Sequence, residues 1–188
     1  MHRLKIAVAI VWLTGSPAVE AKRPVDDQLA LARICAKEEG WDASDGCVGI
    51  HHVLTQGSRY YGMTYAAYAR EYSRSAFTGR FKSGRRSPRP YYADLWPEGR
   101  RPKGWPGKLS WPRHRGSWLR LYRFAGEIQA GAIEDPCEET PDHWGDHGGD
   151  KENAERWGWE PVECGRVANL FWAAPARWAR NPGCIRGL

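Results

Sequence analysis

LARICAKEEGW, residues 31–41, predicts the end of an amphipathic helix with two adjacent carboxylates in its last turn. Apolar side chains recur at helical spacing before the pair, and Gly40 is a residue type at which helices commonly stop. Glu38 is therefore expected near the negative end of the helix dipole and beside the indole of Trp41. Both neighbours disfavour an anionic carboxylate, so we expect a raised pKa at Glu38, which makes it a candidate proton donor.

Helical periodicity continues on both sides of this stretch. Asp26 or Asp27 can cap the first helix, and Ser44 can cap a second one that stops at Gly57. We expect helices near 26–39, 44–57, 64–73 and 117–130, a short helix from Asp150 to Gly158, and strands at 160–164 and 168–172. The expected fold class is α+β, mainly helical, with a short antiparallel ribbon near the C-terminus.

The first residues have the pattern of a secretory signal peptide. A basic start precedes an apolar run from Ile6 to Leu13, and cleavage is expected after Ala21, so that the signal peptide is 1–21. The apolar run is much shorter than the roughly 20 residues that cross a bilayer, and no later segment comes close. We therefore expect one domain at 22–188, with a tail at 174–188, that is secreted or periplasmic, monomeric and without a membrane span.

All five cysteines lie in this expected mature chain, which would meet an oxidising compartment. The count is odd, so one cysteine is left over, and the sequence leaves the pairing open. Cys35 and Cys47 bracket one compact segment, Cys137 and Cys164 bracket another, and Cys184 lies in the tail. Disulfides that close these two loops would each stabilise the fold by about 3 kcal/mol.

The charge of the chain, +6 in total, is strongly segregated. Residues 70–123 hold 15 lysines and arginines against three acids, whereas residues 134–163 hold 11 acids against two bases. The basic part contains a proline-, arginine- and tryptophan-rich stretch, 83–112, which we expect to be a long loop. Its aromatic residues are interspersed with cations, which suits an anionic polymer that offers both charge and stacking surfaces. Nucleic acid and peptidoglycan both fit this description, and export favours peptidoglycan over nucleic acid.

Five segments of the chain, taken in order, carry a family resemblance. They are ICAKEEGW at 34–41, GCVGIHHVL at 46–54, the expected helix at 118–131, the stretch at 135–145 that ends in PDHWG, and GRVANLFW at 165–172. Together they resemble the SleB-type cell-wall hydrolases, which are lysozyme-like enzymes that cleave peptidoglycan. In that family the acid of an E-A-x-G-type motif precedes a helix rich in small residues. Glu39 in place of the usual alanine, the insertion at 83–112 and the cysteines depart from the family pattern.

The resemblance implies a lysozyme-like domain that binds peptidoglycan glycan strands and cleaves the bond between N-acetylmuramic acid and N-acetylglucosamine without a cofactor. Glu38 falls on the catalytic glutamate, Trp144 on an aromatic residue of the glycan cleft, and Asn169 on a position usually held by histidine. The expected substrate-binding residues are Trp41, His51, Trp144, Asn169 and Trp172.

The sequence leaves the type of cleavage open. Hydrolysis by a muramidase needs a second carboxylate, for which Asp42 and Asp45 are nearest in sequence, although both are typical of turns and helix starts. A lytic transglycosylase needs Glu38 alone, because the same group first protonates the leaving oxygen and then helps the muramyl 6-hydroxyl to close an anhydro ring.

DHWGDHGGD, residues 142–150, is rich in metal-ligand types and supports a second hypothesis. His143 and His147 have the i, i+4 spacing of zinc ligands on a helix, but the glycines of this segment disfavour a helix. Two interpretations of the segment remain: a loop that binds calcium or zinc, and an acidic surface loop that binds no metal. We assign no metal ligand. The alternatives to the glycosidase are a zinc-dependent amidase or peptidase that uses His143 and His147, and a non-catalytic cell-wall-binding protein.

Overall fold

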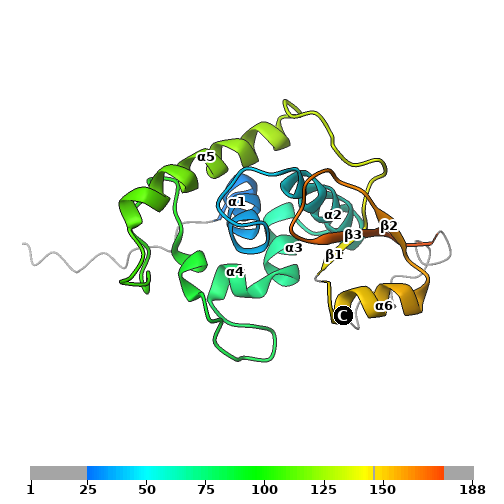
Figure 1. The fold of residues 1–188 in the computed structure, drawn as a ribbon, viewed down its shortest axis with the longest axis horizontal. Helices are drawn as coiled ribbons and strands as arrows, with labels where there is room; N and C mark the ends of the chain where they lie inside the picture. The colour runs from blue at the N-terminus through cyan, green and yellow to red at the C-terminus, as the bar shows by residue number, and fades with distance from the viewer. Residues whose placement is uncertain (1–24, 146, 176–188) are drawn as a thin grey trace, which may run out of the picture.

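The computed structural model of the chain describes residues 25–145 and 147–175 (Figure 1). The elements of this part are α1 (Asp27–Glu38), α2 (Asp45–Tyr61), α3 (Tyr65–Tyr72), α4 (Arg74–Thr78), the 3-10 helix η1 (Pro90–Asp94), α5 (Trp111–Gln129), β1 (His143–Gly145), α6 (Gly149–Trp157), β2 (Glu160–Val162) and β3 (Leu170–Ala173). This confirms a mainly helical α+β fold with a small antiparallel sheet. The expected signal peptide, Cys184 and most of the tail lie outside the described residues. None of the described helices has the length and apolar character that crossing a membrane requires.

Helix α1 is the buried centre of the fold. Asp26 caps it, as the sequence predicts, by accepting a 2.7 Å hydrogen bond from the backbone N–H of Leu29. Residues 29–36 are all buried, because α2, α3, α4 and α5 all contact this helix. The helix ends at Glu38, and Gly40 turns the chain with a φ of +94°, a conformation that favours glycine.

Helix α2 continues past the predicted stop at Gly57 and ends at Gly62. A Cβ atom at position 57 would lie 2.1 Å from the ring of Tyr68, so this glycine allows α3 to approach α2 closely. Gly62, with a φ of +62°, provides the left-handed C-cap instead. Thr64 then caps α3 by accepting a hydrogen bond from the backbone N–H of Ala67.

The stretch 83–112 is largely loop, as predicted, but its aromatic side chains are part of the core. Tyr91, Tyr92, Trp105 and Trp111 are between 2 % and 7 % exposed. Each of these rings removes a large apolar area from water and so holds the loop against the helices. The expectation that this loop presents stacking surfaces to a polymer is therefore wrong for these four residues.

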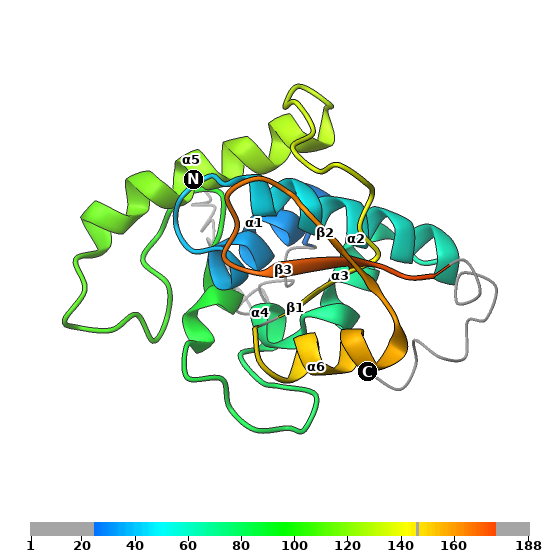
Figure 2. The same ribbon diagram turned by 45° about the vertical axis from the view of Figure 1, so that its right-hand side comes forward.

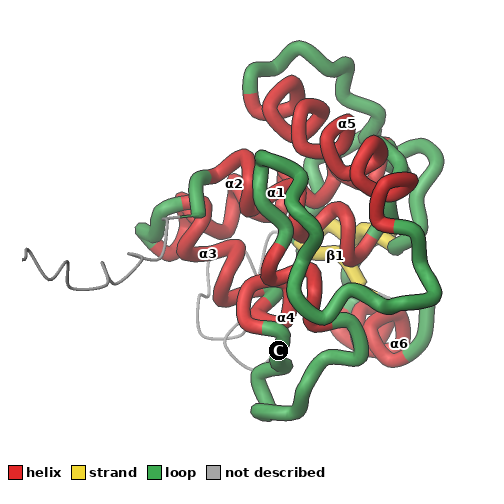
Figure 3. Tube along the Cα trace, turned by 90° about the vertical axis from the view of Figure 1, so that its left-hand side faces the viewer, coloured by secondary structure: helices red, strands yellow, loops and turns green. Residues whose placement is uncertain are grey.

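Two further features fasten the loop. The buried side chain of Arg33 donates from Nε and Nη2 to the carbonyl oxygen of Leu95, at 2.9 and 2.8 Å, and its guanidinium lies 4.7 Å from the ring of Trp96. Helix α5 begins at Trp111, earlier than the predicted 117, and packs along α1 with the loop beside its first half (Figure 3).

Three short strands form the sheet in the order β1-β3-β2. Phe171 of β3 lies opposite Trp144 of β1 on one side and Val162 of β2 on the other. The sequence predicts β2 and β3 but not β1. Gly49 of α2 accommodates Phe171, because a Cβ atom there would lie 2.6 Å from its ring. The sheet therefore rests on the helical core and lies between α2 and the short α6 (Figure 2).

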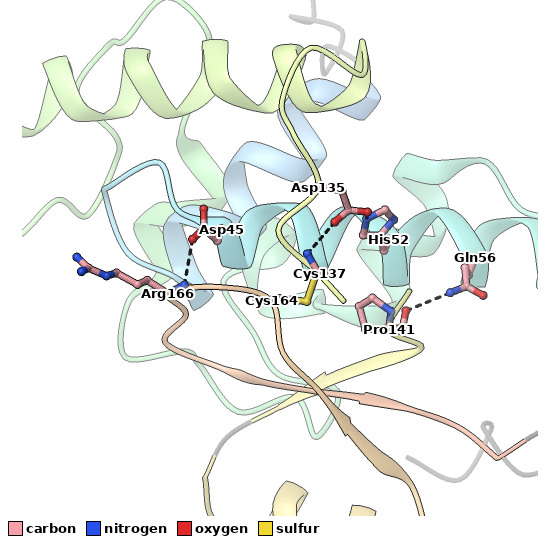
Figure 4. Close-up of a disulfide and its surroundings, with 8 residues drawn as sticks. All are labelled: Asp45, His52, Gln56, Asp135, Cys137, Pro141, Cys164 and Arg166. Carbon is pink, nitrogen blue, oxygen red and sulfur yellow. Dashed lines mark hydrogen bonds and ion pairs between the residues drawn. A yellow bond between two sulfur atoms is a disulfide. The ribbon is translucent and has the colours of Figure 1, made fainter. Parts of the chain in front are cut away.

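One of the two expected disulfides is confirmed. Cys137 and Cys164 are bonded, which joins the segment before β1 to the end of β2 (Figure 4). The expected Cys35–Cys47 disulfide is wrong, because both cysteines are free and fully buried in the structure. A buried thiol behaves as a small apolar side chain, and these two share a side-chain hydrogen bond. Burial raises the pKa of the Cys35 thiol, which keeps it protonated and unreactive.

Candidate active site

A cavity of about 950 Å³ opens where the end of α1, the helices α3 and α4, and the sheet with α6 meet. This volume is within the usual range of ligand pockets. Three residues that the sequence predicts for the site line this cavity: Glu38, Trp144 and Asn169. They come from α1, β1 and the start of β3, so the fold brings together segments that are more than a hundred residues apart in the chain.

Glu38 is partly withdrawn from solvent, with 21 % of its side chain exposed. Its Oε1 atom forms an ion pair with the ammonium group of Lys37 and accepts a 3.2 Å hydrogen bond from Oγ of Ser73. Lys37 also donates to Oγ of Ser73 at 3.3 Å, so the three side chains hold one another. Oε2 of Glu38 has no hydrogen-bond partner among the described residues, which leaves this oxygen for a ligand. The predicted neighbour Trp41 is not beside Glu38, and a cation and a hydroxyl take its place.

Glu39 has a different role from its neighbour. Its carboxylate accepts hydrogen bonds from the backbone N–H of Ala168 at 2.8 Å, and from Nδ2 and the backbone N–H of Asn169 at 2.9 and 3.3 Å. Gly46 makes room for it, because a Cβ atom there would lie 2.3 Å from the carboxylate. Glu39 therefore ties the end of α1 to the chain that enters β3. In the sequence Glu39 is a departure from the pattern of the family that the chain resembles, and no local signal predicts its structural role.

Asn169 connects the two glutamates. Its Nδ2 atom donates to the backbone carbonyl of Glu38 at 3.2 Å as well as to Oε1 of Glu39. The side chain of Asn169 is 9 % exposed and lines the cavity. The geometry therefore makes it a positioning residue for the backbone of Glu38.

Aromatic rings form another wall of the cavity. Trp144 is 5 % exposed and stacks on Tyr72 of α3, with the ring centroids 4.3 Å apart and an angle of 26° between the planes. The hydroxyl of Tyr72 forms a hydrogen bond with Nδ1 of His143. Burial lowers the pKa of His143 to about 4, so at neutral pH its imidazole is uncharged. Burial raises the pKa of Tyr72, so its hydroxyl stays protonated beside the neutral ring.

Three further carboxyl groups line the same cavity: Glu71, Asp142 and Asp150. Asp142, just before β1, accepts a 2.9 Å hydrogen bond from the backbone N–H of Ala174, and burial raises its pKa. The two candidates that are nearest to Glu38 in sequence do not line the cavity. Asp42 is exposed, and Asp45 accepts a 3.0 Å hydrogen bond from the backbone N–H of Arg166, in the loop between β2 and β3 (Figure 4). The segment 142–150 was singled out for metal ligands, and its first residue is instead an acid of the cavity.

Three of the predicted substrate-binding residues lie outside the cavity lining. Trp41 packs among Tyr92, Trp105 and His114 beneath the long loop. His51 forms a 3.1 Å hydrogen bond with the hydroxyl of Tyr65, and burial lowers its pKa to about 4. Trp172 is 3 % exposed and packs in a small cluster with Ala154 and Trp159. Packing within the fold accounts for all three, so their expected contact with substrate finds no geometric support here.

The described residues contain one group of three side chains close enough to share a metal ion: His52, Asp135 and Cys137. The sulfur of Cys137 is in the disulfide and is not available as a thiolate ligand. His52 and Asp135 form a 2.8 Å hydrogen bond that fastens the segment before β1 to α2 (Figure 4). His143 and His147 do not gather a third ligand in the described part of the chain, so the zinc-dependent alternative has no ligand set there.

The chain matches no family model, no curated protein and no solved structure. What it does is therefore inferred from the geometry of this cavity and from the residues that line it.

Proposed function

We propose that the protein is an exported peptidoglycan glycosidase with a lysozyme-like domain, in which Glu38 is the general acid for cleavage between N-acetylmuramic acid and N-acetylglucosamine. The observation that carries this proposal is the position of Glu38 in the lining of a large cavity that the stacked rings of Tyr72 and Trp144 also line. Export through the expected signal peptide and binding to glycan strands belong to the same proposal. The resemblance of the segments around Glu38, Trp144 and Asn169 to the SleB-type enzymes supports it further.

The cavity has the groups that glycoside cleavage requires. A general acid must lie within hydrogen-bonding reach of the leaving oxygen, and Oε2 of Glu38 is the oxygen free for that contact. Lys37 and Ser73 hold Oε1, which fixes the orientation of the carboxyl group relative to the cavity. After proton transfer, the same carboxylate is placed to act as the base of the second step.

The aromatic wall supplies binding area for sugar rings. Tyr72 lines the cavity and is partly exposed, whereas Trp144, 5 % exposed, stacks on Tyr72 and so supports its ring. The Tyr side chain also carries a polar group at the ring edge. The indole N–H of Trp159, which also lines the cavity, has no hydrogen-bond partner among the described residues.

The test is the lytic rate on purified peptidoglycan. Glu38→Gln removes the acid but keeps the shape of the side chain, and we expect it to lower the rate of turbidity loss by at least a thousandfold while the melting temperature stays within about 2 °C. Glu127→Gln, an exposed glutamate of α5, is the matched control and should leave the rate unchanged. A Glu38→Gln variant that lyses walls at the wild-type rate would overturn the assignment.

Mass spectrometry of the products tests the bond and the route. Anhydro-muramyl ends indicate a lytic transglycosylase that uses Glu38 alone. Reducing muramyl ends indicate a muramidase, for which the candidate second carboxyl groups are the other acids of the cavity lining, Glu71, Asp142 and Asp150. Freed peptides on uncut glycan strands would contradict the proposal, as would wall binding with no released product.

A further inference from the structure

The outer face of α5 is a stripe of arginines that the proposed catalytic chemistry does not use. This helix buries Trp118, Leu121 and Ala125 against the core. The opposite face exposes Arg113, Arg120 and Arg123, which follow each other at intervals of seven and three residues. At 1.5 Å per residue they extend along about 15 Å of the helix axis. We call Arg113, Arg120 and Arg123 the arginine stripe.

Neighbouring residues extend the positive charge of the arginine stripe. Arg115 donates from Nε to the carbonyl oxygen of Gly99 at 3.1 Å, which places the loop with the exposed Arg100 and Arg101 beside the first half of α5. Within α5 itself the only acid is Glu127, while Asp26 and Glu98 lie near enough to act on Tyr122 of the same helix. Glu127 lies 3.9 Å from Nε of Arg123, in a solvent-exposed pair of the kind that contributes little.

The arginine stripe lies far from the candidate active site in the fold. Helix α5 runs along one edge of the molecule, and α1 separates it from the sheet and α6 (Figures 1 and 3). None of its residues lines the 950 Å³ cavity. A partner on the stripe and a glycan strand in the cavity can therefore be bound at the same time.

The kind of side chain in the stripe limits the kind of partner. All three cations are arginines, whose planar guanidinium group matches the oxygens of a phosphate in a two-point contact. The nearby rings of Trp111 and Trp118 are 7 % and 0 % exposed, and Tyr122 and Phe124 of α5 are partly buried and pack against the core, so the surface offers much charge and little ring area. Single-stranded nucleic acids are bound by stacking as well as by charge, which favours a partner that needs charge alone. The fit is to a linear chain whose charge lies on its backbone and which has no bases.

We propose that the arginine stripe docks the protein onto a linear phosphodiester polymer of the polyol-phosphate class, as found in cell envelopes. Gly116 lies between Arg113 and Arg120 on the same face, and a Cβ atom there would meet nothing closer than Nη1 of Arg120 at 3.7 Å. The polymer backbone can therefore approach the helix between the two guanidinium groups. Docking on this surface is independent of whether Glu38 cleaves glycan.

The test is direct binding of the full chain to purified poly(glycerol phosphate). The variant Arg113→Gln/Arg120→Gln/Arg123→Gln should bind at least tenfold more weakly than the wild type at 100 mM salt. Its plot of log affinity against log salt should be flatter by about 2, because each lost phosphate contact removes about 0.7 from the slope. The variant Lys151→Gln/Arg156→Gln/Arg166→Gln removes three exposed cations elsewhere and should bind like the wild type.

Three results would overturn the proposal. The two triple variants could lose affinity equally, which would show a general charge effect. The wild type could bind walls equally well before and after removal of their phosphodiester polymers, which would indicate peptide carboxylates as the partner. It could also bind anionic phospholipid vesicles or single-stranded DNA more tightly than the polymer. Binding is measured without catalysis, so failure of the glycosidase proposal would appear separately, as an unchanged lytic rate in Glu38→Gln.

Discussion

Replacing Glu39 by glutamine tests whether this residue is a structural clamp rather than a catalyst. Its carboxylate accepts three N–H groups, at 2.8, 2.9 and 3.3 Å, from Ala168 and Asn169. Hydrogen bonds to a charged group contribute about 1.5–3 kcal/mol each and neutral ones about half of that. A glutamine also turns an NH₂ group toward at least one of these donors. We therefore expect Glu39→Gln to lower the free energy of unfolding by about 3 kcal/mol, or roughly 10 °C in melting temperature.

Glu38→Gln is the matched control, because the same change is made one residue away. The contacts of Glu38 are an ion pair with Lys37 and one hydrogen bond, and its side chain is partly exposed, so the loss should stay below about 1 kcal/mol. Urea unfolding followed by circular dichroism measures both variants under the same conditions. Equal free energies of unfolding for Glu38→Gln and Glu39→Gln would refute the clamp.

The remaining predictions concern packing, covalent linkage and pH. Gly49→Ala should lower the free energy of unfolding by about 2 kcal/mol, because its Cβ would lie 2.6 Å from the ring of Phe171. Gly107→Ala, whose Cβ would have no atom within 4 Å, should be neutral in the same urea titration. Cys137→Ser removes a crosslink with a sequence separation of 27, worth about 3–4 kcal/mol of unfolded-chain entropy, and calorimetry should show the loss. The folded-state pKa of His143, about 4, is below its unfolded value of 6.5, so the unfolded chain binds the proton first as the pH falls. The free energy of unfolding should therefore decrease between pH 6.5 and pH 4, by up to about 1.4 kcal/mol per pH unit. His143→Gln should remove this part of the pH dependence.

Local signals in the sequence predict some helix boundaries and miss others. Asp26 and Thr64 cap α1 and α3 as expected, because a cap depends on a side chain and a backbone group three residues apart. Gly57 and Gly62 look alike as stops, but only the second ends α2. The difference comes from Tyr68, which lies over Gly57 in the folded chain and cannot be located from the sequence near the glycine.

The long loop shows a second limit of the sequence. Its composition indicates a loop, and this is confirmed. Composition does not show which of its side chains are buried, because that depends on the partners that the fold supplies. The aromatic rings of Tyr91 and Trp105 have a large apolar area to bury, whereas the arginines around them remain exposed. The expected surface of mixed charge and rings is thus divided into a buried aromatic layer and an exposed cationic one.

The sequence locates the candidate site at the pair Glu38 and Glu39, but it does not show which of the two lines the cavity and which is structural. Both residues lie at the end of α1, where the helix stops at Glu38 and Gly40 reverses the chain, so the two side chains leave in different directions. Which of them reaches the cavity is decided by Ala168 and Asn169, about 130 residues later, whose N–H groups engage Glu39. These donors satisfy the charge of Glu39 within the fold. Glu38, held through one oxygen, is then the carboxyl group of the pair that a substrate can reach.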